Sequence, residues 1–233
     1  GRATALALAQ RGATVGINDL KPEFVDEAVA AVRAAGGQAI GLAQDVSTRD
    51  GMHAAVRRLV AEAGRLDILV NNAAWVRYQA AAEITPEAMD RMVDIGFKSV
   101  IWGIQAAAEV MDPARGGAII NVASIAGFKS PLRSMVYSGI KAGVMGITRA
   151  AAAELGARGI RVNAVAPGAV PTEGTAKVRN AELDARRIAR TPLGRLGTVQ
   201  DIADAICFLA GDDARFVSAE VLRLDGGMSE TSL

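Results

Sequence analysis

Three residues in the second half of the chain have the types and spacing for alcohol and ketone chemistry. Tyr137 and Lys141 are four positions apart in a stretch with a helical pattern, so their side chains should share one helix face. An ammonium group beside a phenol favours the phenolate, so we expect Lys141 to lower the pKa of Tyr137 and make it a general acid and base. Ser124 follows an apolar run, 118–123, with the pattern of a buried parallel strand, and open α/β sheets bind ligands at the carboxyl ends of such strands. Tyr-x-x-x-Lys alone also arises by chance on amphipathic helices, so the assignment depends on the flanking sequence.

The elements that would position these residues alternate along the chain. Short β-branched runs at 13–18, 67–71 and 160–165 are separated by longer alanine-rich stretches, which predicts βαβ units and a parallel sheet with helices on both faces. Thr85 and Thr198 are predicted helix N-caps. With 233 residues, of which 51% are hydrophobic and 22% charged, the chain is predicted to form a single α/β domain.

Composition excludes several function classes. The net charge of +1, from 26 basic and 25 acidic residues, provides no field that would select nucleic acid or an anionic membrane. The single Cys207 lies in an apolar helical stretch and is predicted to be a buried structural thiol. His53 is the only histidine, so a metal site built from several histidines is excluded, and we expect His53 at the surface. No apolar run of 18 residues or signal-like start occurs, so a cytoplasmic protein is expected.

Several short motifs then occur in the order and spacing of one family. They are Asn71-Asn72-Ala73-Ala74, Ser124 with Tyr137 and Lys141, Pro167-Gly168, Pro192-Leu193-Gly194-Arg195 and Leu224-Asp225-Gly226-Gly227. Through these motifs the chain resembles the classical short-chain dehydrogenases/reductases over essentially its whole length. The resemblance implies a Rossmann-type doubly wound parallel sheet in three layers, a nicotinamide cofactor and a homotetramer. It also implies that Tyr137 exchanges the proton with substrate, Ser124 hydrogen-bonds the reacting oxygen, and Lys141 holds the nicotinamide ribose.

The cofactor residues are predicted from strand ends and from the resemblance. Asp19 ends a strand, where a carboxylate can accept hydrogen bonds from the adenosine ribose hydroxyls and would repel a 2′-phosphate, so NAD is preferred over NADP. Asp45 and Val46 match the family's adenine-contacting pair. Alternatively, Asp19 and Asp45 could each serve only to form the turn that follows its strand. Val170 and Thr172 match positions that hold the nicotinamide carboxamide. The complete predicted cofactor set is Gly1, Asp19, Leu20, Asp45, Val46, Asn72, Ala73, Tyr137, Lys141, Val170 and Thr172.

Two features depart from the family pattern. Gly96 stands where the family usually has an asparagine, whose side chain fixes a water that links the lysine to bulk solvent. The Gly96 carbonyl, and a helix irregularity that glycine permits, could still seat a water, so we expect a slower proton relay. Ala74 in place of a common glycine is a smaller change.

The second departure is at the start of the chain. The residues after Gly1 are similar to the helix that follows the family's first strand and glycine-rich turn. Without that central strand, two sheet edges would be unpaired. We therefore expect that an amino-terminal segment precedes Gly1 or that something else fills the position.

The sequence is less informative about the residues that would bind the substrate. Residues 171–195 match the family's variable lid, and its charges are expected to form a solvated helix face. Trp75 and Phe128 could line an apolar pocket or serve in packing. The basic residues Lys129 and Arg133 are compatible with an acidic substrate but do not by themselves indicate one. The lid charges in question are Lys177, Arg179, Arg186, Arg187 and Arg190.

Three functions are compatible with these observations. The leading prediction is an NAD-dependent dehydrogenase that acts on a small secondary alcohol or ketone. The alternative is a 3-oxoacyl-thioester reductase, although Asp19 counts against the usual NADPH dependence of that group. The third is a catalytically weakened binding or assembly subunit, which the intact Ser124, Tyr137 and Lys141 argue against. No metal site is expected.

Overall fold

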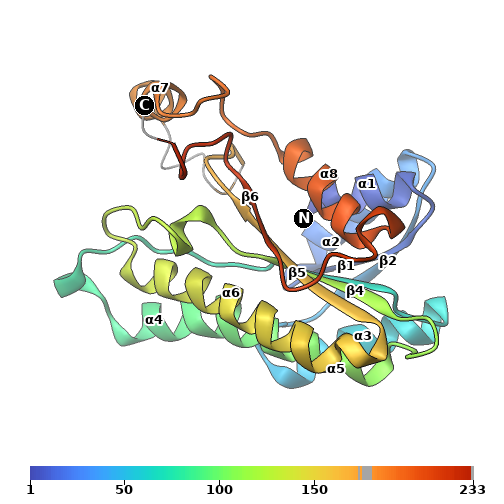
Figure 1. The fold of residues 1–233 in the computed structure, drawn as a ribbon. Coiled ribbons are helices and arrows are strands. Elements are labelled where there is room, and N and C mark those ends of the chain that lie inside the picture. Colours follow the sequence, from blue (N-terminus) through green and yellow to red (C-terminus); the bar gives the residue numbers. More distant parts are fainter. Residues whose placement is uncertain (173, 175–179, 232–233) are drawn as a thin grey trace.

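The computed structural model describes residues 1–172, 174 and 180–231 of the chain (Figure 1). Helices and strands alternate along most of its length, as the sequence predicts. In chain order, the principal elements are α1 (Arg2–Gln10), β1 (Thr14–Asp19), α2 (Pro22–Ala34), β2 (Gln38–Ala43), α3 (Arg49–Ala63), β3 (Ile68–Asn71), α4 (Pro86–Val93), a π-helix (Asp94–Lys98), α5 (Ser99–Val110), β4 (Gly117–Val122), α6 (Met135–Leu155), β5 (Ile160–Pro167), α7 (Ala181–Ala189), α8 (Val199–Ala210) and β6 (Val221–Leu224).

All strand pairs are parallel, and the described strands form two hydrogen-bonded groups. β1 pairs with β2, with Thr14 opposite Gln38, and the second group has the order β3-β4-β5-β6. Within the second group, Ile68 is opposite Ala118, and Gly117 is opposite Ile160. Among the described residues, β1 and β3 each have one partner strand only, so each has an edge without a backbone partner. The order within both groups fits the doubly wound topology.

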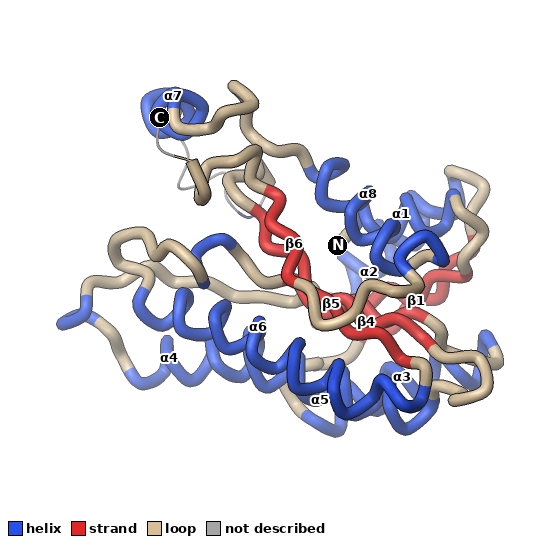
Figure 2. Tube along the Cα trace, viewed as in Figure 1, coloured by secondary structure: helices blue, strands red, loops and turns tan. Residues whose placement is uncertain are grey.

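Helices cover both faces of the strands (Figure 2). α2 packs on β1 and β2, and α8 packs on β4 and β5 and also contacts α1. On the opposite face, α5 packs on β3, α6 packs on β5, and α3 packs against α5. The predicted three-layer α/β architecture is confirmed. It explains why the central strands are mostly apolar, since Ile119, Val162 and Val165 are fully buried between two helical layers.

Both predicted helix starts are confirmed. The Ala88 N–H donates to Thr85 Oγ1 (3.3 Å), with Pro86 in the first turn of α4. Thr198 caps α8, where the Asp201 N–H donates to Thr198 Oγ1 (3.1 Å). Because these caps satisfy backbone donors that have no partner within the helix, they fix where each helix begins.

One prediction about isolated residues is confirmed and one is wrong. Cys207 is buried in α8, and burial raises the pKa of its thiol. His53, expected at the surface, is only 4% exposed. Its inward position on α3 is possible because α5 supplies polar partners: Nδ1 lies 3.2 Å from Glu109 Oε2, and Nε2 lies 3.2 Å from Gln105 Oε1. Within the described ranges, every helix is too short or too polar to cross a lipid bilayer.

Candidate active site

Ser124 lies just beyond the carboxyl end of β4. The strand ends at Val122, and Ser124 is the N-cap of a short 3-10 helix, Ile125–Gly127. The Ala126 N–H donates to Ser124 Oγ (3.1 Å), which fixes the orientation of the hydroxyl oxygen. The prediction that Ser124 occupies a ligand-binding strand end of the sheet fits this placement.

Tyr137 and Lys141 lie on one face of α6, as their spacing predicts. The Lys141 Nζ is 5.9 Å from the centroid of the Tyr137 ring. The lysine is only 4% exposed, and its Nζ donates a 2.6 Å hydrogen bond to the Val122 carbonyl at the end of β4. Burial lowers the pKa of Lys141 to about 8, because an ammonium group is poorly solvated there. The amine is therefore mostly protonated at neutral pH but close to its titration point.

The expected lowering of the tyrosine pKa is wrong for this structure. Burial raises the pKa of Tyr137, the neighbouring Tyr78 raises it further, and only a hydrogen bond with Ser124 lowers it. The physical reason is that the Lys141 ammonium is directed toward the Val122 carbonyl rather than toward the phenol. Desolvation of the phenolate therefore dominates.

A buried polar chain holds α6 against the sheet. The Asn71 Nδ2 donates to Asn121 Oδ1 (2.9 Å), and the Asn121 Nδ2 donates to Thr148 Oγ1 (3.0 Å). Thr148 lies two helical turns after Lys141, and it donates in turn to the Val144 carbonyl (2.8 Å). These hydrogen bonds connect β3, β4 and α6, and so they help to set where Tyr137 and Lys141 lie.

Gly96 lies in the π-helix that joins α4 to α5. The irregularity expected at this glycine is therefore present. Gly96 is buried, and a Cβ added to it would lie 3.2 Å from Ile140 Cγ2. Ile140 directly precedes Lys141, so the position at which the family usually has an asparagine packs here against α6.

The two predicted cofactor carboxylates lie in exposed turns. Asp19 ends β1, and its Oδ1 accepts the Lys21 N–H (3.0 Å). Asp45 follows β2, and its Oδ1 accepts the N–H (3.0 Å) and the hydroxyl (2.6 Å) of Ser47. Both therefore act as turn formers, and neither use prevents a carboxylate from accepting further hydrogen bonds from a ligand.

The other predicted cofactor residues lie at the same edge of the strands. Gly1 precedes α1, and a Cβ added to it would lie 3.2 Å from the Asn72 amide nitrogen, just after β3. Val170 follows β5 and contacts Gly197 closely enough that a Cβ there would lie 3.0 Å away. Of the remainder, Leu20, Ala73 and Thr172 are exposed, while Val46 packs partly on the core between α3 and α5. Backbone and small side chains along the carboxyl ends of parallel strands suit an extended dinucleotide.

Sequence reasoning missed Tyr78. Its ring meets that of Tyr137 edge to face, with centroids 6.0 Å apart and planes at 67°. The side chain is 46% exposed, and burial raises the pKa of its phenol. A single tyrosine in a loop has no periodicity to mark it, and only the fold brings it to Tyr137.

The segment that carries Tyr78 is tied to the loop before α6. The Gln79 N–H donates to the Arg133 carbonyl (2.9 Å), and the Arg133 guanidinium pairs with Glu83 (2.7 Å). Arg133 has a left-handed backbone with φ of 63°, which is uncommon for a residue with a side chain. Arg133 therefore positions two loops, and its charge is already neutralised.

Trp75 and Phe128, which the sequence could not assign to a pocket or to packing, both have packing partners. Trp75 packs against the core around Met92, and the Arg91 guanidinium lies 4.5 Å from its ring centroid. Phe128 is 43% exposed, with the Arg223 guanidinium 4.2 Å from its ring. For Trp75 the packing interpretation is therefore the better one.

The predicted lid includes α7. Arg186 and Arg190 are exposed, as a solvated helix face requires, whereas Arg187 is half-buried. Of the other lid charges, Lys177 and Arg179 lie outside the described residues. The prediction of a solvated helix face therefore holds for Arg186 and Arg190 but not for Arg187.

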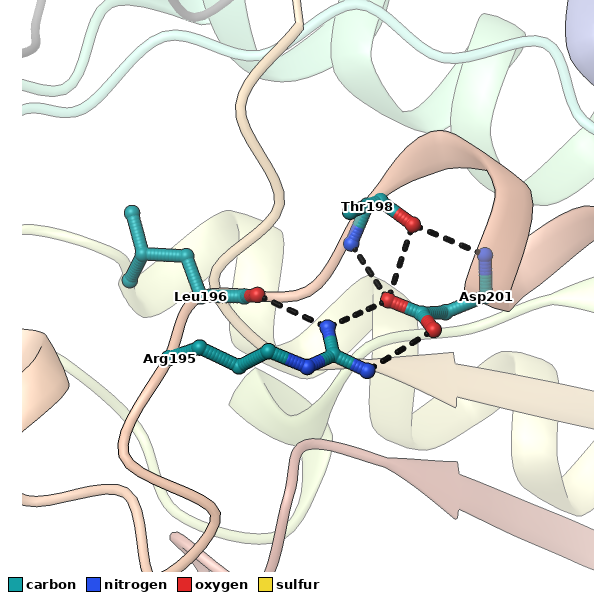
Figure 3. A network of polar contacts seen from close by, with 4 residues as sticks. All are labelled: Arg195, Leu196, Thr198 and Asp201. Carbon is teal, nitrogen blue, oxygen red and sulfur yellow. Dashed lines mark hydrogen bonds and ion pairs between the residues drawn. The ribbon is translucent and has the colours of Figure 1, made fainter.

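A network at the base of the lid fixes the start of α8 (Figure 3). Arg195 forms two hydrogen bonds with Asp201, at 2.7 and 2.9 Å, and the Thr198 N–H donates to the same carboxylate (2.7 Å). These contacts hold the pKa of the Asp201 carboxyl far below its usual range. Arg195 and Asp201 also line a cavity of about 570 Å³, which does not include Ser124, Tyr137 or Lys141. Arg195 therefore holds the start of α8 and borders this cavity.

In the described part of the chain, no group of three or more histidine, cysteine, aspartate or glutamate side chains could hold a metal ion. The candidate site consists instead of a serine, a tyrosine and a lysine at the carboxyl end of β4. A family model of the short-chain dehydrogenases/reductases, described as enoyl-(acyl carrier protein) reductase, matches residues 1–229. The chain belongs to the short-chain dehydrogenase/reductase family.

Similar proteins in this family cover nearly the whole chain. Cis-4-hydroxycyclohexanecarboxylate dehydrogenase of Sinomonas cyclohexanicum is 42% identical, with 97% of this chain and 91% of the relative covered. A 3-oxoacyl-(acyl-carrier-protein) reductase of Thermotoga maritima is 36% identical, with 98% and 92% covered. The structure of 7α-hydroxysteroid dehydrogenase with NADH and 7-oxo glycochenodeoxycholic acid superimposes with a TM-score of 0.93 at 30% identity, with 97% and 89% covered. Short-chain dehydrogenases/reductases use nicotinamide cofactors, and the protein is an oxidoreductase of this family.

Proposed function

We propose that this protein is an NAD-dependent dehydrogenase that interconverts a small secondary alcohol and its ketone. The observation that carries the proposal is the grouping of Ser124, Tyr137 and Lys141 at the carboxyl end of β4. The relative named for a hydroxylated ring is 42% identical, which supports a cyclic or otherwise hydroxylated substrate. We also propose a homotetramer, as is usual in the family, and small molecules rather than nucleic acids or membranes as partners.

The proposed mechanism assigns one task to each catalytic side chain. In the oxidative direction, the Tyr137 phenolate oxygen accepts the proton of the substrate hydroxyl, and in reduction the phenol returns it. Ser124 hydrogen-bonds the reacting oxygen as well as Tyr137, so it orients both. Lys141 holds a positive charge beside the tyrosine ring and stabilises the phenolate once substrate and cofactor exclude water. The nicotinamide, when bound, accepts or supplies the hydride.

Asp19 supports NAD rather than NADP. Its carboxylate is exposed at the carboxyl end of β1, where a 2′-phosphate would meet a negative charge. We expect NADH to bind at least tenfold more tightly than NADPH, and Asp19→Ser to narrow that ratio by about tenfold, since an unfavourable charge contact is removed. Fluorescence titration with NADH and with NADPH measures the two affinities and hence their ratio. Asp45→Ser is the matched control, because Asp45 lies in the turn after the neighbouring strand. Equal affinities in the wild type would contradict the preference.

A second candidate is reduction of a 3-oxoacyl thioester. The description of the matching family model and the 36% identical Thermotoga maritima reductase favour it, and it would use the same proton path through Tyr137. Initial rates with a panel of cyclic alcohols and NAD, and with acetoacetyl thioester and NADH or NADPH, separate the two functions. Turnover of the thioester alone would replace the leading proposal, and turnover of neither class would contradict both.

A further inference from the structure

The segment that begins with Ser124 is tightly bonded within itself and packed against α6. The Gly127 N–H donates to the Ser124 carbonyl (3.0 Å), and the Phe128 N–H donates to the Ile125 carbonyl (2.9 Å). A Cβ added to Gly127 would lie only 2.8 Å from the backbone nitrogen of Ala142 on α6. Because these bonds join consecutive residues into one short 3-10 turn, a displacement of Phe128 would be transmitted to Ser124.

Arg223 of β6 holds the Phe128 end of this segment. Its guanidinium carbon lies 4.2 Å from the centroid of the Phe128 ring, which places a cation over the aromatic ring. The Arg223 side chain is only 32% exposed. A partly desolvated cation–π contact is stronger than a fully exposed one, so this contact can fix the position of the ring.

Arg223 is itself anchored. It lies opposite Ala166 in the parallel pairing of β5 and β6, and its guanidinium pairs with Glu230 in the turn that follows β6. Asp225 holds the same turn by accepting the Ser229 N–H (2.8 Å). The arginine is therefore a support fixed at both its backbone and its charged end.

We propose that Arg223 is a positioning residue of the active site, which holds Phe128 so that the Ser124 hydroxyl meets Tyr137 and the reacting oxygen. This inference rests on the proposed function, in which Ser124 orients both groups. Arg223 acts through Phe128 in this role and not on the substrate itself. Loss of the cation should leave the sheet intact but weaken the hydrogen bond between Ser124 and Tyr137.

Arg223→Met tests this role, because it removes the charge but keeps an apolar stem. Turnover is measured with NAD and either cyclohexanol or cis-4-hydroxycyclohexanecarboxylate, whichever the wild type oxidises faster. We expect kcat to fall by roughly three- to thirtyfold, the factor that corresponds to loss of a cation–π contact. Affinity for NADH, measured by fluorescence titration, should stay within about twofold.

The dependence of kcat on pH gives the decisive readout. The hydrogen bond with Ser124 lowers the pKa of Tyr137, so weakening this bond should raise that pKa and move the oxidation profile to higher pH. Lys141, with a pKa of about 8, titrates in the same range. Ser124→Ala is therefore the reference, since it removes the hydroxyl and leaves Lys141 in place. Arg223→Met should shift the profile in the same direction by a smaller amount.

Three further variants separate positioning from general loss of packing. Phe128→Leu should reproduce both effects, and the double variant with Arg223→Met should be no slower than the slower single variant, because both changes remove one contact. Arg223→Lys should recover part of kcat, since it restores a cation. Arg91→Met is the matched control: the Arg91 guanidinium lies 4.5 Å from the Trp75 ring, and its loss should leave kcat and the pH profile unchanged.

The inference would be overturned by a wild-type kcat in Arg223→Met, by a lower kcat without the shift in pH, by fully additive losses in the double variant, or by an equal loss in Arg91→Met. Should Arg223→Met fail to fold, Phe128→Leu alone must show both effects. If the wild type turns over only acetoacetyl thioester, reduction is measured instead, and the alkaline decline of kcat should move to higher pH. Turnover of neither alcohol nor thioester would contradict the proposed function.

Discussion

The catalytic face of α6 and the exposed turns after β1 and β2 differ in how firmly their polar groups are fixed. Lys141 is almost fully buried and bonded to the Val122 carbonyl, and the helix that carries it is tied to β4 through Thr148. Asp19 and Asp45 instead lie in solvent and are bonded only to their own turns. The proposed chemistry therefore lies in a rigid region, and the proposed cofactor selection lies in exposed turns that can adjust.

This difference has an energetic origin. Proton transfer depends on atoms held within tenths of an ångström, which a buried and hydrogen-bonded framework provides. Binding of a flexible dinucleotide tolerates local adjustment, and exposed carboxylates avoid the penalty of burying a charge. Substitutions on α6 should therefore lower turnover, whereas substitutions in the turns after β1 and β2 should change cofactor affinity.

Tyr137→Phe should have the largest effect. Removing the only proton acceptor proposed for the substrate hydroxyl should lower kcat by roughly 10²–10⁴-fold, while NADH affinity stays within about twofold because the ring and its contact with Tyr78 remain. Turnover and fluorescence titration on the same sample measure both quantities. Asp19→Ser is the reciprocal control, since it should weaken NADH binding but preserve kcat at saturating cofactor. Normal turnover of Tyr137→Phe would remove Tyr137 from the mechanism.

Lys141→Met should abolish most activity yet stabilise the fold at neutral pH. The folded pKa of Lys141 is about 8 against 10.5 for a free lysine, so the unfolded chain binds more protons between these values. The free energy of unfolding of the wild type therefore rises as pH increases from about 8 to 10.5, and below that window the buried ammonium costs up to about 3 kcal/mol. Loss of the hydrogen bond to Val122 offsets about 1 kcal/mol of the gain.

Thermal unfolding across pH 6–10.5 checks this linkage. The melting temperature of Lys141→Met should exceed that of the wild type at pH 7, and the difference should shrink as pH rises. Lys98→Met is the matched control, because Lys98 is exposed and paired with Asp94 and should show no such convergence. A lower melting temperature of Lys141→Met at every pH would mean that the hydrogen bond to Val122 outweighs desolvation.

The same contrast explains what the sequence could predict. Helical spacing brought Tyr137 and Lys141 to one face, and strand periodicity located Ser124, because both follow from local geometry. The direction of the Lys141 ammonium, and hence the pKa of Tyr137, depends on a carbonyl 19 residues away that no local pattern reveals. Tyr78 and the buried His53 were missed for the same reason, since their partners come from distant segments.

Gly96 offers the finest test of the rigid region. A side chain there must displace Ile140, which lies 3.2 Å from the added Cβ and directly precedes Lys141. Gly96→Ala introduces this contact alone, whereas Gly96→Asn also adds an amide that could hold water near the lysine. We expect both variants to be less stable than the wild type by about 1 kcal/mol, because each forces the packing to adjust. Turnover of Gly96→Asn should nevertheless exceed that of Gly96→Ala by a few fold if proton transfer past Lys141 limits the rate. Equal turnover of the two variants, each below the wild type, would show instead that the π-helix has repacked around glycine and that proton release uses another route.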